Sequence, residues 1–183
     1  MRGARAGKKL AAEALWNFAL KALGGRAHSA GELRRKLASR AAEPADVDTT
    51  LRRLKEHGYL DDRRFAESYA GARLENQGLG RTRVLRDLRE RRVAPSVAER
   101  AVAKTYSGVD EIGLIENFVE RKILRSRSGA RLRDPKELAA AYRKLIRAGF
   151  TPGNALRVLK RVAHDPELVD GFEPPQEEEE AGE

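Results

Sequence analysis

The chain has no cysteine among its 183 residues, and it has no long apolar run. Without cysteine it can form no disulfide, no thiolate metal site and no cysteine nucleophile. No stretch approaches the roughly 18 consecutive apolar residues of a membrane-spanning helix. The basic N-terminus is not followed by the apolar segment that a signal peptide requires. We therefore expect a cytoplasmic protein that does not enter a membrane.

Aromatic residues are also scarce, at 5% of the chain, although hydrophobic residues make up 40%. A core with so few aromatics must consist mainly of leucine, valine and alanine. Together with abundant arginine and glutamate, this composition favours helices. The alternation of valine, isoleucine, threonine and aromatic residues that is typical of strands is absent. The composition therefore predicts an all-α protein.

Sequence patterns of known catalytic and metal sites are missing as well. The three histidines, His28, His57 and His164, are not spaced as ligands on one helix face. The chain has no nucleophile elbow, no Walker loop and no dinucleotide-binding glycine pattern after a strand. The turn at 78–80, followed by Arg81, is the nearest thing to a phosphate cradle, but it follows a predicted helix and we interpret it as a helix end. We expect no enzyme, no catalytic residue, no metal and no cofactor.

The charge is distributed unevenly along the chain. There are 37 Lys and Arg residues against 28 Asp and Glu, which gives a net charge of +9. The last eleven residues contain six glutamates and no basic residue, so that residues 1–172 carry +15. A folded body this basic attracts polyanions such as nucleic acid, with an affinity that falls steeply as salt rises. A basic surface that serves only solubility is the alternative.

Signals for helix starts and ends divide the chain clearly. Ser29 and Glu32 are spaced as a capping box, in which each side chain binds a free backbone amide of the first helical turn. Asp134, Pro135 and Glu137 form the clearest helix start, with an acidic cap, a proline in the first position and a glutamate in the third. Between such signals, apolar residues recur at helical spacing. The pattern predicts three groups of three helices.

The three groups are versions of one another. Residues 88–102 and 145–159 align without a gap, with Leu88 aligned to Leu145. The first group aligns from Leu37, so that the repeats are 51 and 57 residues apart. A period near 50 is typical of tandem repeats that stack on their neighbours. We predict an all-α fold of three tandem three-helix repeats forming an elongated, curved array. The predicted boundaries are a disordered basic tail at 1–9, repeats at 10–58, 59–107 and 108–165, and a disordered acidic tail at 166–183.

Arginines on the outer faces of these helices are candidate binding residues, because a guanidinium group binds phosphates and carboxylates through paired hydrogen bonds. The alternative is a solvated helix face with internal ion pairs, such as Asp87 with Arg91. Aromatic side chains that could stack on bases are expected in the cores, which argues against sequence-specific reading of single strands. The candidate arginines are Arg34, Arg35, Arg52, Arg53, Arg63, Arg64, Arg81, Arg83, Arg86, Arg125, Arg127 and Arg131.

One segment carries a longer pattern. Residues 58–93 contain Gly58, Tyr59, Leu60, Asp62, Arg64, Phe65, Ala66, Tyr69, Arg73 and Gly80, followed by the stretch 85–88. With this pattern the chain resembles the RecX family, bacterial regulators of the RecA recombinase. The resemblance runs over about residues 12–162 and is weakest in the third repeat. Much of the pattern also has a structural explanation, because Gly58 is expected to end a helix, and Phe65 and Tyr69 to fill the core.

The resemblance implies a partner and an action. RecX proteins are tandem three-helix repeats that bind RecA filaments in the helical groove and oppose filament growth, ATP hydrolysis and strand exchange, and some also bind DNA. On this basis we expect a non-enzymatic, monomeric modulator of RecA, acting in homologous recombination, DNA repair and the SOS response. The RecA filament is the expected partner, and single- or double-stranded DNA is a further candidate. Arg73 of the matching segment joins the candidate binding residues.

Two other classes of protein fit part of the pattern. One is a DNA-binding regulator similar to helix-turn-helix proteins, in which one helix of each repeat enters a major groove without dependence on RecA. Such a protein should bind a defined duplex site more tightly than random DNA. The other is a structural adaptor without nucleic-acid contact, whose binding would depend little on salt.

Overall fold

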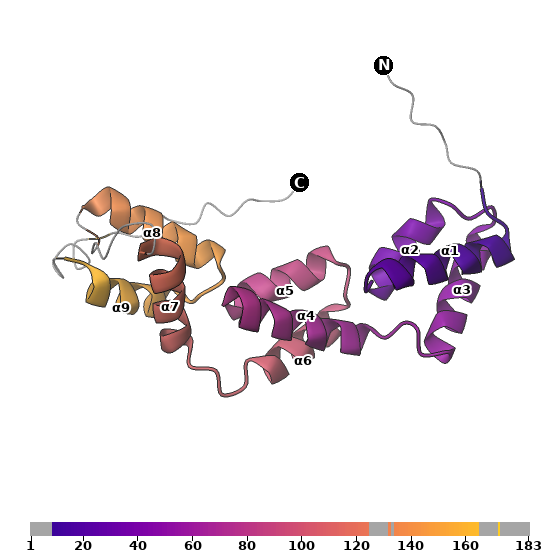
Figure 1. The fold of residues 1–183 in the computed structure, drawn as a ribbon. Helices are drawn as coiled ribbons and strands as arrows, with labels where there is room; N and C mark the ends of the chain where they lie inside the picture. The colour runs from indigo at the N-terminus through magenta and orange to yellow at the C-terminus, as the bar shows by residue number, and fades with distance from the viewer. Residues whose placement is uncertain (1–8, 125–131, 133, 165–171, 173–183) are drawn as a thin grey trace, which may run out of the picture. The chain divides into compact units, whose positions relative to one another are not determined.

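The computed structural model describes residues 9–124, 132, 134–164 and 172 (Figure 1). Over these residues it contains no β-strand, and isolated bridges pair Leu10 with Ala41 and Leu132 with Ala163. The predicted all-α fold built from three-helix groups is confirmed. The helices are α1 (Ala12–Gly25), α2 (Ala30–Ala38), α3 (Pro44–Glu56), α4 (Asp62–Gln77), α5 (Arg81–Glu90), α6 (Pro95–Thr105), α7 (Glu111–Val119), the π-helical segment η1 (Glu120–Leu124), α8 (Pro135–Arg147) and α9 (Pro152–Val162).

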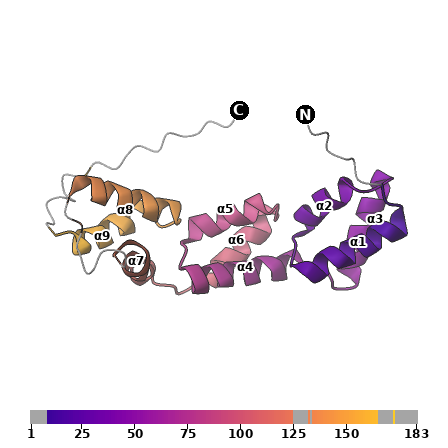
Figure 2. The same ribbon diagram turned by 45° about the horizontal axis from the view of Figure 1, so that its top comes forward.

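The packing divides the chain into two compact units. The first comprises residues 1–72 and 85–105, and the second comprises residues 73–84 and 106–183. Figures 1 and 2 show α1, α2 and α3 grouped together in the first unit, and α7, α8 and α9 grouped together in the second. Helices α4 and α5 each contribute one part to the first unit and one part to the second.

Each unit has its own apolar core. The core of α1, α2 and α3 is built largely of leucines, and the core of the second unit adds aromatic rings to aliphatic side chains. Phe118 and Phe150 meet edge to face there, with ring centroids 5.4 Å apart. The buried residues of these two cores include Leu15, Leu33, Leu37, Val47, Leu51, Leu54 and Leu60 in the first unit, and Ile115, Phe118, Leu138, Tyr142, Leu145, Phe150, Val158 and Leu159 in the second.

The predicted helix starts are confirmed by their hydrogen bonds. Glu32 donates its backbone N–H to the Ser29 hydroxyl over 3.0 Å, and the Glu32 carboxylate accepts the N–H of Ser29 over 3.3 Å. Asp134 accepts the N–H of Glu137 over 2.9 Å, with Pro135 in the first helical position. Asp61 accepts two backbone N–H groups of the first turn of α4. Each cap satisfies amides that the helix itself cannot bond.

The same contact between neighbouring helix groups occurs in each unit. In the first unit the hydroxyl of Ser29, which precedes α2, donates to the carbonyl of Arg91 in the α5–α6 turn. In the second unit the N–H of Gly80, which precedes α5, donates to the carbonyl of Ala148 in the α8–α9 turn over 2.8 Å. Gly80 follows Ser29 by 51 residues and Ala148 follows Arg91 by 57, the spacings of the sequence repeat. The repeat therefore includes the contact that joins one group to the next.

The first helix group has an equivalent turn between α2 and α3. Its Arg40 corresponds to Arg91 in the repeat, and the Arg40 carbonyl accepts the N–H of Leu10 over 2.8 Å. Ala42 donates its N–H back to the carbonyl of Leu10 over 2.8 Å. The segment before α1 thus takes the place that a preceding repeat would occupy, as a cap does in a repeat protein.

One expectation from the sequence is corrected. Phe65 and Tyr69 were expected to fill the core, but both are only half-buried, and the residues of α4 that are fully buried are Ala66 and Ala70. The buried face of α4 is therefore formed by small alanines, and the rings lie at its flank. Helix α7 is α-helical to Val119, and η1 continues the helical path through Leu124 with wider turns.

Most of the segments predicted to lack structure lie outside the described residues. These are the tails at 1–9 and 166–183, apart from Lys9 and Phe172. The arginine-rich stretch at 125–133 also lies outside the described residues, apart from Leu132. The ring of Phe172 meets Tyr142 edge to face, with centroids 5.4 Å apart. Among the described residues no helix is long and apolar enough to span a bilayer.

Candidate binding surface

The structure distributes the predicted arginines over both units. Three of the candidates, Arg125, Arg127 and Arg131, lie outside the described residues. The others are exposed except for Arg73 and Arg83, which are half-buried. In the first unit lie Arg34 and Arg35 on α2, Arg52 and Arg53 on α3, Arg63 and Arg64 on α4, and Arg86 on α5; in the second lie Arg73 at the end of α4, and Arg81 and Arg83 on α5.

Several of these arginines contact other groups of the chain. Arg34 forms an ion pair with Asp48 across α2 and α3, and Arg63 forms one with Glu67 one turn along α4. The guanidinium of Arg53 lies over the ring of Trp16, 4.2 Å from its centroid. Surface ion pairs of this kind contribute at most about 1 kcal/mol and exchange readily with an external anion.

A smaller set has no such contact. Among the described residues, none forms a hydrogen bond or ion pair with the guanidinium of Arg35, Arg52, Arg64 or Arg81. Arg35 and Arg52 belong to helices that pack against each other, and Arg64 lies in the first turn of α4. These arginines are the predicted binding residues best placed to meet an anionic partner, because no internal contact has to break first.

The junction of α2 with the α5–α6 turn is organised by Glu32. Its carboxylate accepts hydrogen bonds from Arg26 at 3.2 Å and from Arg91 at 3.1 Å, and its side chain is only 17% exposed. Burial raises the pKa of Glu32, but the hydrogen bonds from Arg26 and the Ser29 amide outweigh it and leave the pKa lowered. The Arg91 guanidinium also covers the ring of Tyr69, 4.7 Å from its centroid. This network joins elements far apart in the sequence.

His28 lies beside this network and is nearly fully buried. Its Nδ1 is 3.5 Å from the Glu32 carboxylate. Burial is the main reason that the pKa of His28 is lowered from its ordinary 6.5, and the positive charge of Arg26 acts in the same direction. His28 therefore stays neutral in the folded chain at pH values where the unfolded chain has begun to bind a proton.

Acid should destabilise the first unit in two stages. The unfolded chain binds more protons than the folded one wherever a pKa is lowered by folding, so stability is lost as the pH falls through each folded pKa. The first loss begins below about 6.5, from His28, and the second below about 4.5, from Glu32. Urea unfolding followed by circular dichroism from about pH 8 to about pH 4 measures both. His28→Gln should remove the first stage alone and Glu32→Gln should weaken the second. A profile that neither variant alters would contradict this assignment.

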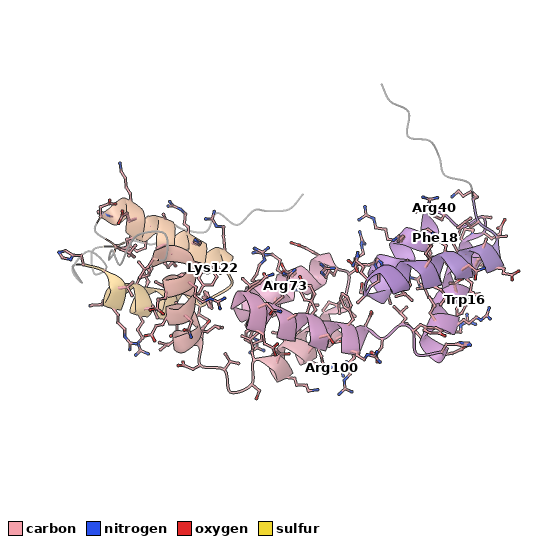
Figure 3. The ribbon with its side chains drawn as sticks, viewed as in Figure 1. Trp16, Phe18, Arg40, Arg73, Arg100 and Lys122 are labelled. Atoms are coloured by element: carbon pink, nitrogen blue, oxygen red, sulfur yellow. The ribbon has the colours of Figure 1, made fainter. Side chains whose placement is uncertain are left out.

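A row of rings covers one side of α1 in the same unit. Trp16 meets His57 edge to face with centroids 5.8 Å apart, and His57 lies nearly parallel to Tyr59 at 6.2 Å. Figure 3 shows Trp16 on the opposite side of α1 from Phe18, which lies beside Arg40. Phe18 has Lys36 and Arg40 within 6 Å of its ring centroid. Each side of α1 therefore combines an aromatic ring with cations of the adjoining helix.

The row of rings ends at a hollow in the surface of the first unit. This cavity has a volume of about 490 Å³. Tyr59, Phe65 and Tyr69 line it, together with Arg64 and His28. The sequence analysis did not find this arrangement, because it placed Phe65 and Tyr69 in the core. The pattern that carries the family resemblance nevertheless contains five of the lining residues, Gly58, Tyr59, Arg64, Phe65 and Tyr69.

Among the described residues, no group of three or more histidine or carboxylate side chains is placed to hold a metal ion. The glycine turn at 78–80 has a structural role. Gly78 has a positive φ of 62° at the end of α4, and the Gly80 amide bonds to Ala148. The interpretation of this turn as a helix end is confirmed.

Comparison with known proteins identifies both helix groups of the N-terminal half. The first three-helix domain of RecX matches residues 16–54, and the second matches residues 61–102. A protein of Vibrio parahaemolyticus described as Regulatory protein RecX is 34% identical over 133 residues, which cover 73% of this chain and 81% of that protein. One of Deinococcus radiodurans with the same description is 34% identical over 168 residues, covering 92% and 74%.

Solved structures agree on the fold. The crystal structure of RecX from Lactobacillus salivarius superposes with a TM-score of 0.68 at 17% identity and covers 82% of this chain and 96% of that one. A second crystal structure, of regulatory protein RecX, gives a TM-score of 0.64 at 16% identity. At this identity the likeness concerns the arrangement of helices alone.

Proposed function

Because the chain belongs to the RecX family of regulatory proteins, we propose that it regulates the RecA recombinase by binding the RecA filament and opposing filament growth, ATP hydrolysis and strand exchange. The observation that carries the proposal is the match of both three-helix domains, supported by relatives that are about one third identical over most of their length. The protein acts in the cytoplasm, as a monomer, through binding rather than catalysis.

Electrostatics supplies the binding force in this proposal. A RecA filament on DNA is a nucleoprotein polyanion, and residues 1–172 carry +15. Arg35 and Arg52, which have no internal partner among the described residues, form charge-assisted hydrogen bonds to carboxylates or phosphates of the filament. Each such bond contributes roughly 1.5–3 kcal/mol when it is well formed. Bound protein blocks addition of the next RecA subunit and restrains the movement that accompanies ATP hydrolysis.

The direct test is the ATPase activity of RecA on single-stranded DNA, measured with increasing amounts of this protein over a salt series. We expect inhibition below one protein per RecA subunit, weakening as salt rises. The double variant Arg35→Glu with Arg52→Glu should need at least about tenfold more protein for half-inhibition, the equivalent of about 1.4 kcal/mol. The matched control is Arg143→Glu with Arg157→Glu, which changes the charge equally at exposed residues of α8 and α9.

Three outcomes would count against the proposal. RecA ATPase that does not respond to the protein at any salt concentration would rule out direct regulation. Equal losses in the variant and its control would show that only net charge matters and that these two arginines have no special place. Binding of a defined duplex sequence, with RecA ATPase unchanged, would instead indicate a DNA-binding regulator that acts without RecA.

A further inference from the structure

Tyr59 is the one large hydrophobic side chain that stands exposed in the described part of the chain, at 57%. An exposed aromatic ring gains nothing for folding, and its surface remains available for another planar group. Tyr59 is also held in place, because its backbone N–H donates to the carbonyl of Leu54 over 2.9 Å and the next residue, Leu60, is buried. The ring therefore projects from a fixed backbone position and can serve as a platform.

Two further rings and a guanidinium group continue the row behind the Tyr59 ring. The His57 ring lies within 7° of parallel to Tyr59, and the Trp16 ring meets both at steeper angles. The guanidinium of Arg53 closes the other end of the row, 4.2 Å from the centre of the Trp16 ring. Rings stacked in this way restrict the rotation of Tyr59, which lowers the entropy lost when a ligand stacks on it.

The hollow next to Tyr59 is large enough for a small planar ligand. Its volume of about 490 Å³ is within the range of ligand pockets in proteins, about 300–1,000 Å³. Phe65 and Tyr69 form a second aromatic wall, with their rings 20° from parallel and 6.1 Å between centroids. The pocket therefore presents flat apolar surfaces from α4 as well as from the segment before it.

The charged groups of the pocket select the ligand's charge. Arg64 is exposed, and no group among the described residues bonds to its guanidinium. Among the described residues that line the pocket, Asp61 is the one carboxylate, and its Oδ1 already accepts the backbone N–H groups of Arg63 and Arg64 at 2.9 and 3.0 Å. A ligand with a planar ring and a nearby negative charge can stack on the aromatic side chains of the pocket and bind the guanidinium of Arg64.

From this geometry we propose that the pocket binds an unpaired base of single-stranded nucleic acid, with the base stacked on Tyr59 and the adjoining phosphate bound by Arg64. Bases in a duplex are stacked on their neighbours and cannot reach the Tyr59 ring, whereas a single strand offers every base face. Stacking of this kind is tolerant of sequence, because all bases present a flat face. The site thus holds a strand without reading its sequence.

This inference goes beyond the proposed regulation of RecA, because it assigns to the chain a contact with unpaired bases that needs no RecA. An experiment can therefore contradict one of these two proposals without contradicting the other. Loss of the pocket's function would leave binding through Arg35 and Arg52 untouched, and absence of RecA inhibition would leave the pocket able to bind a strand.

Trp16 is the only tryptophan of the chain, which makes its fluorescence a reporter of this row of rings. We would titrate the full-length protein, without RecA, with oligothymidylate and with an abasic oligonucleotide of the same length. The abasic strand has the phosphates but no bases. We expect oligothymidylate to quench Trp16 and to bind about 5- to 150-fold more tightly than the abasic strand at equal salt, the effect of about 1–3 kcal/mol from one stacked base.

Variants separate stacking from charge. Tyr59→Ala should reduce affinity for oligothymidylate to that for the abasic strand, and Tyr59→Phe, which keeps the ring, should retain it. Arg64→Ala should lower the affinity for both oligothymidylate and the abasic strand. Substitution of Arg157, an exposed arginine of α9, with alanine should change neither affinity. Because Tyr59 is exposed, its substitution should leave the unfolding curve almost unchanged, and circular dichroism checks this.

Two results would overturn the proposal. Equal affinity for the two strands, unaffected by Tyr59→Ala, would show that only phosphates are bound. Quenching of Trp16 by RecA protein alone, with no response to oligothymidylate, would show that the pocket docks a protein side chain instead.

Discussion

Replacing Gly80 with alanine should destabilise the second unit by about 2–4 kcal/mol. A Cβ atom at this position would lie 2.2 Å from the carbonyl oxygen of Gly149, 2.4 Å from its carbonyl carbon and 2.7 Å from the amide nitrogen of Phe150. All three atoms belong to the backbone, which cannot swing aside as the end of a side chain can. Overpacking of this kind costs roughly 1–3 kcal/mol, and the expected loss is larger when a hydrogen bond breaks as well.

That additional loss is expected because the two backbones are bonded to each other. The Gly80 amide donates to Ala148 over 2.8 Å, and the amide of Thr82 donates to Gly149 over 3.3 Å. Moving α5 away to make room for a methyl group lengthens both bonds. Gly149 has no freedom to compensate, because its φ of +89° already requires glycine and its Cα faces the backbone of Arg83.

A substitution in the first unit, two residues beyond the position that corresponds to Gly80, should behave in the same way. A Cβ at Gly31 would lie 2.3 Å from the carbonyl oxygen of Arg92, in the α5–α6 turn that accepts the Ser29 hydroxyl bond. If the contact between helix groups is a repeated feature, Gly31→Ala and Gly80→Ala should both lower the midpoint of urea unfolding.

Gly71 provides the matched control. It lies inside α4, and a Cβ there would meet no atom within 4 Å. Alanine is the better helix former, so Gly71→Ala should stabilise the chain by about 0.5–1 kcal/mol. Urea unfolding of the three variants, followed by circular dichroism, gives the comparison. A Gly80→Ala protein as stable as the parent would mean that the close approach of α5 to the α8–α9 turn is not present in solution.

The sequence was sufficient to predict helices and repeats because those features depend on neighbouring residues. A capping box places its two partners three residues apart, and the aligned Leu88 and Leu145 are buried because both occupy the same position of a helical period. Such signals are local, so the pattern contains them in full.

Contacts between distant residues were not predictable in the same way. Glu32 was recognised as half of a capping box, but nothing in helical spacing pairs it with Arg91, 59 residues further along. Gly80 was interpreted as a helix end, whereas its small size is required by the approach of Gly149. In each case the sequence identified the residue, and only the packing of helices supplies the second physical reason for it.

The candidate site shows the same division. The sequence predicted the exposed positions of Arg35 and Arg52 from the apolar faces of their helices. It did not predict the aromatic pocket, because the large rings of Phe65 and Tyr69 were assigned to the core. The buried positions of α4 are instead taken by alanines, whose low hydrophobicity gives a weak signal in the sequence.

A second large effect is expected at Glu111, which ties the start of α7 to the start of α9. Its carboxylate accepts the N–H of Thr151 at 3.0 Å, the hydroxyl of Thr151 at 2.7 Å and the side-chain amide of Asn154. Burial raises the pKa of Glu111, but the bonds from Thr151 and Asn154 outweigh it and leave the pKa lowered. The charged form is therefore the one that the fold holds.

Glu111→Ala should cost about 1.5–3 kcal/mol, because it removes the charged acceptor of three hydrogen bonds that link the start of α7 to the start of α9. The control is Glu116→Ala on the same helix. Glu116 pairs with Arg161 at 2.6 Å, but both side chains are about half exposed, at 46% and 59%. An exposed pair of this kind contributes about 0–1 kcal/mol and is screened by salt.

Urea unfolding of both variants at low and high salt distinguishes the two glutamates. The loss in Glu111→Ala should persist at high salt, because all three partners of Glu111 are uncharged and the bond from Asn154 is partly buried, whereas the small loss in Glu116→Ala should disappear. Glu111→Gln should recover part of the stability, since the amide oxygen still accepts one bond but carries no charge. If Glu111→Ala were no more destabilising than Glu116→Ala, the link between α7 and α9 would rest on the apolar core that contains Ile115 and Leu159 rather than on this carboxylate.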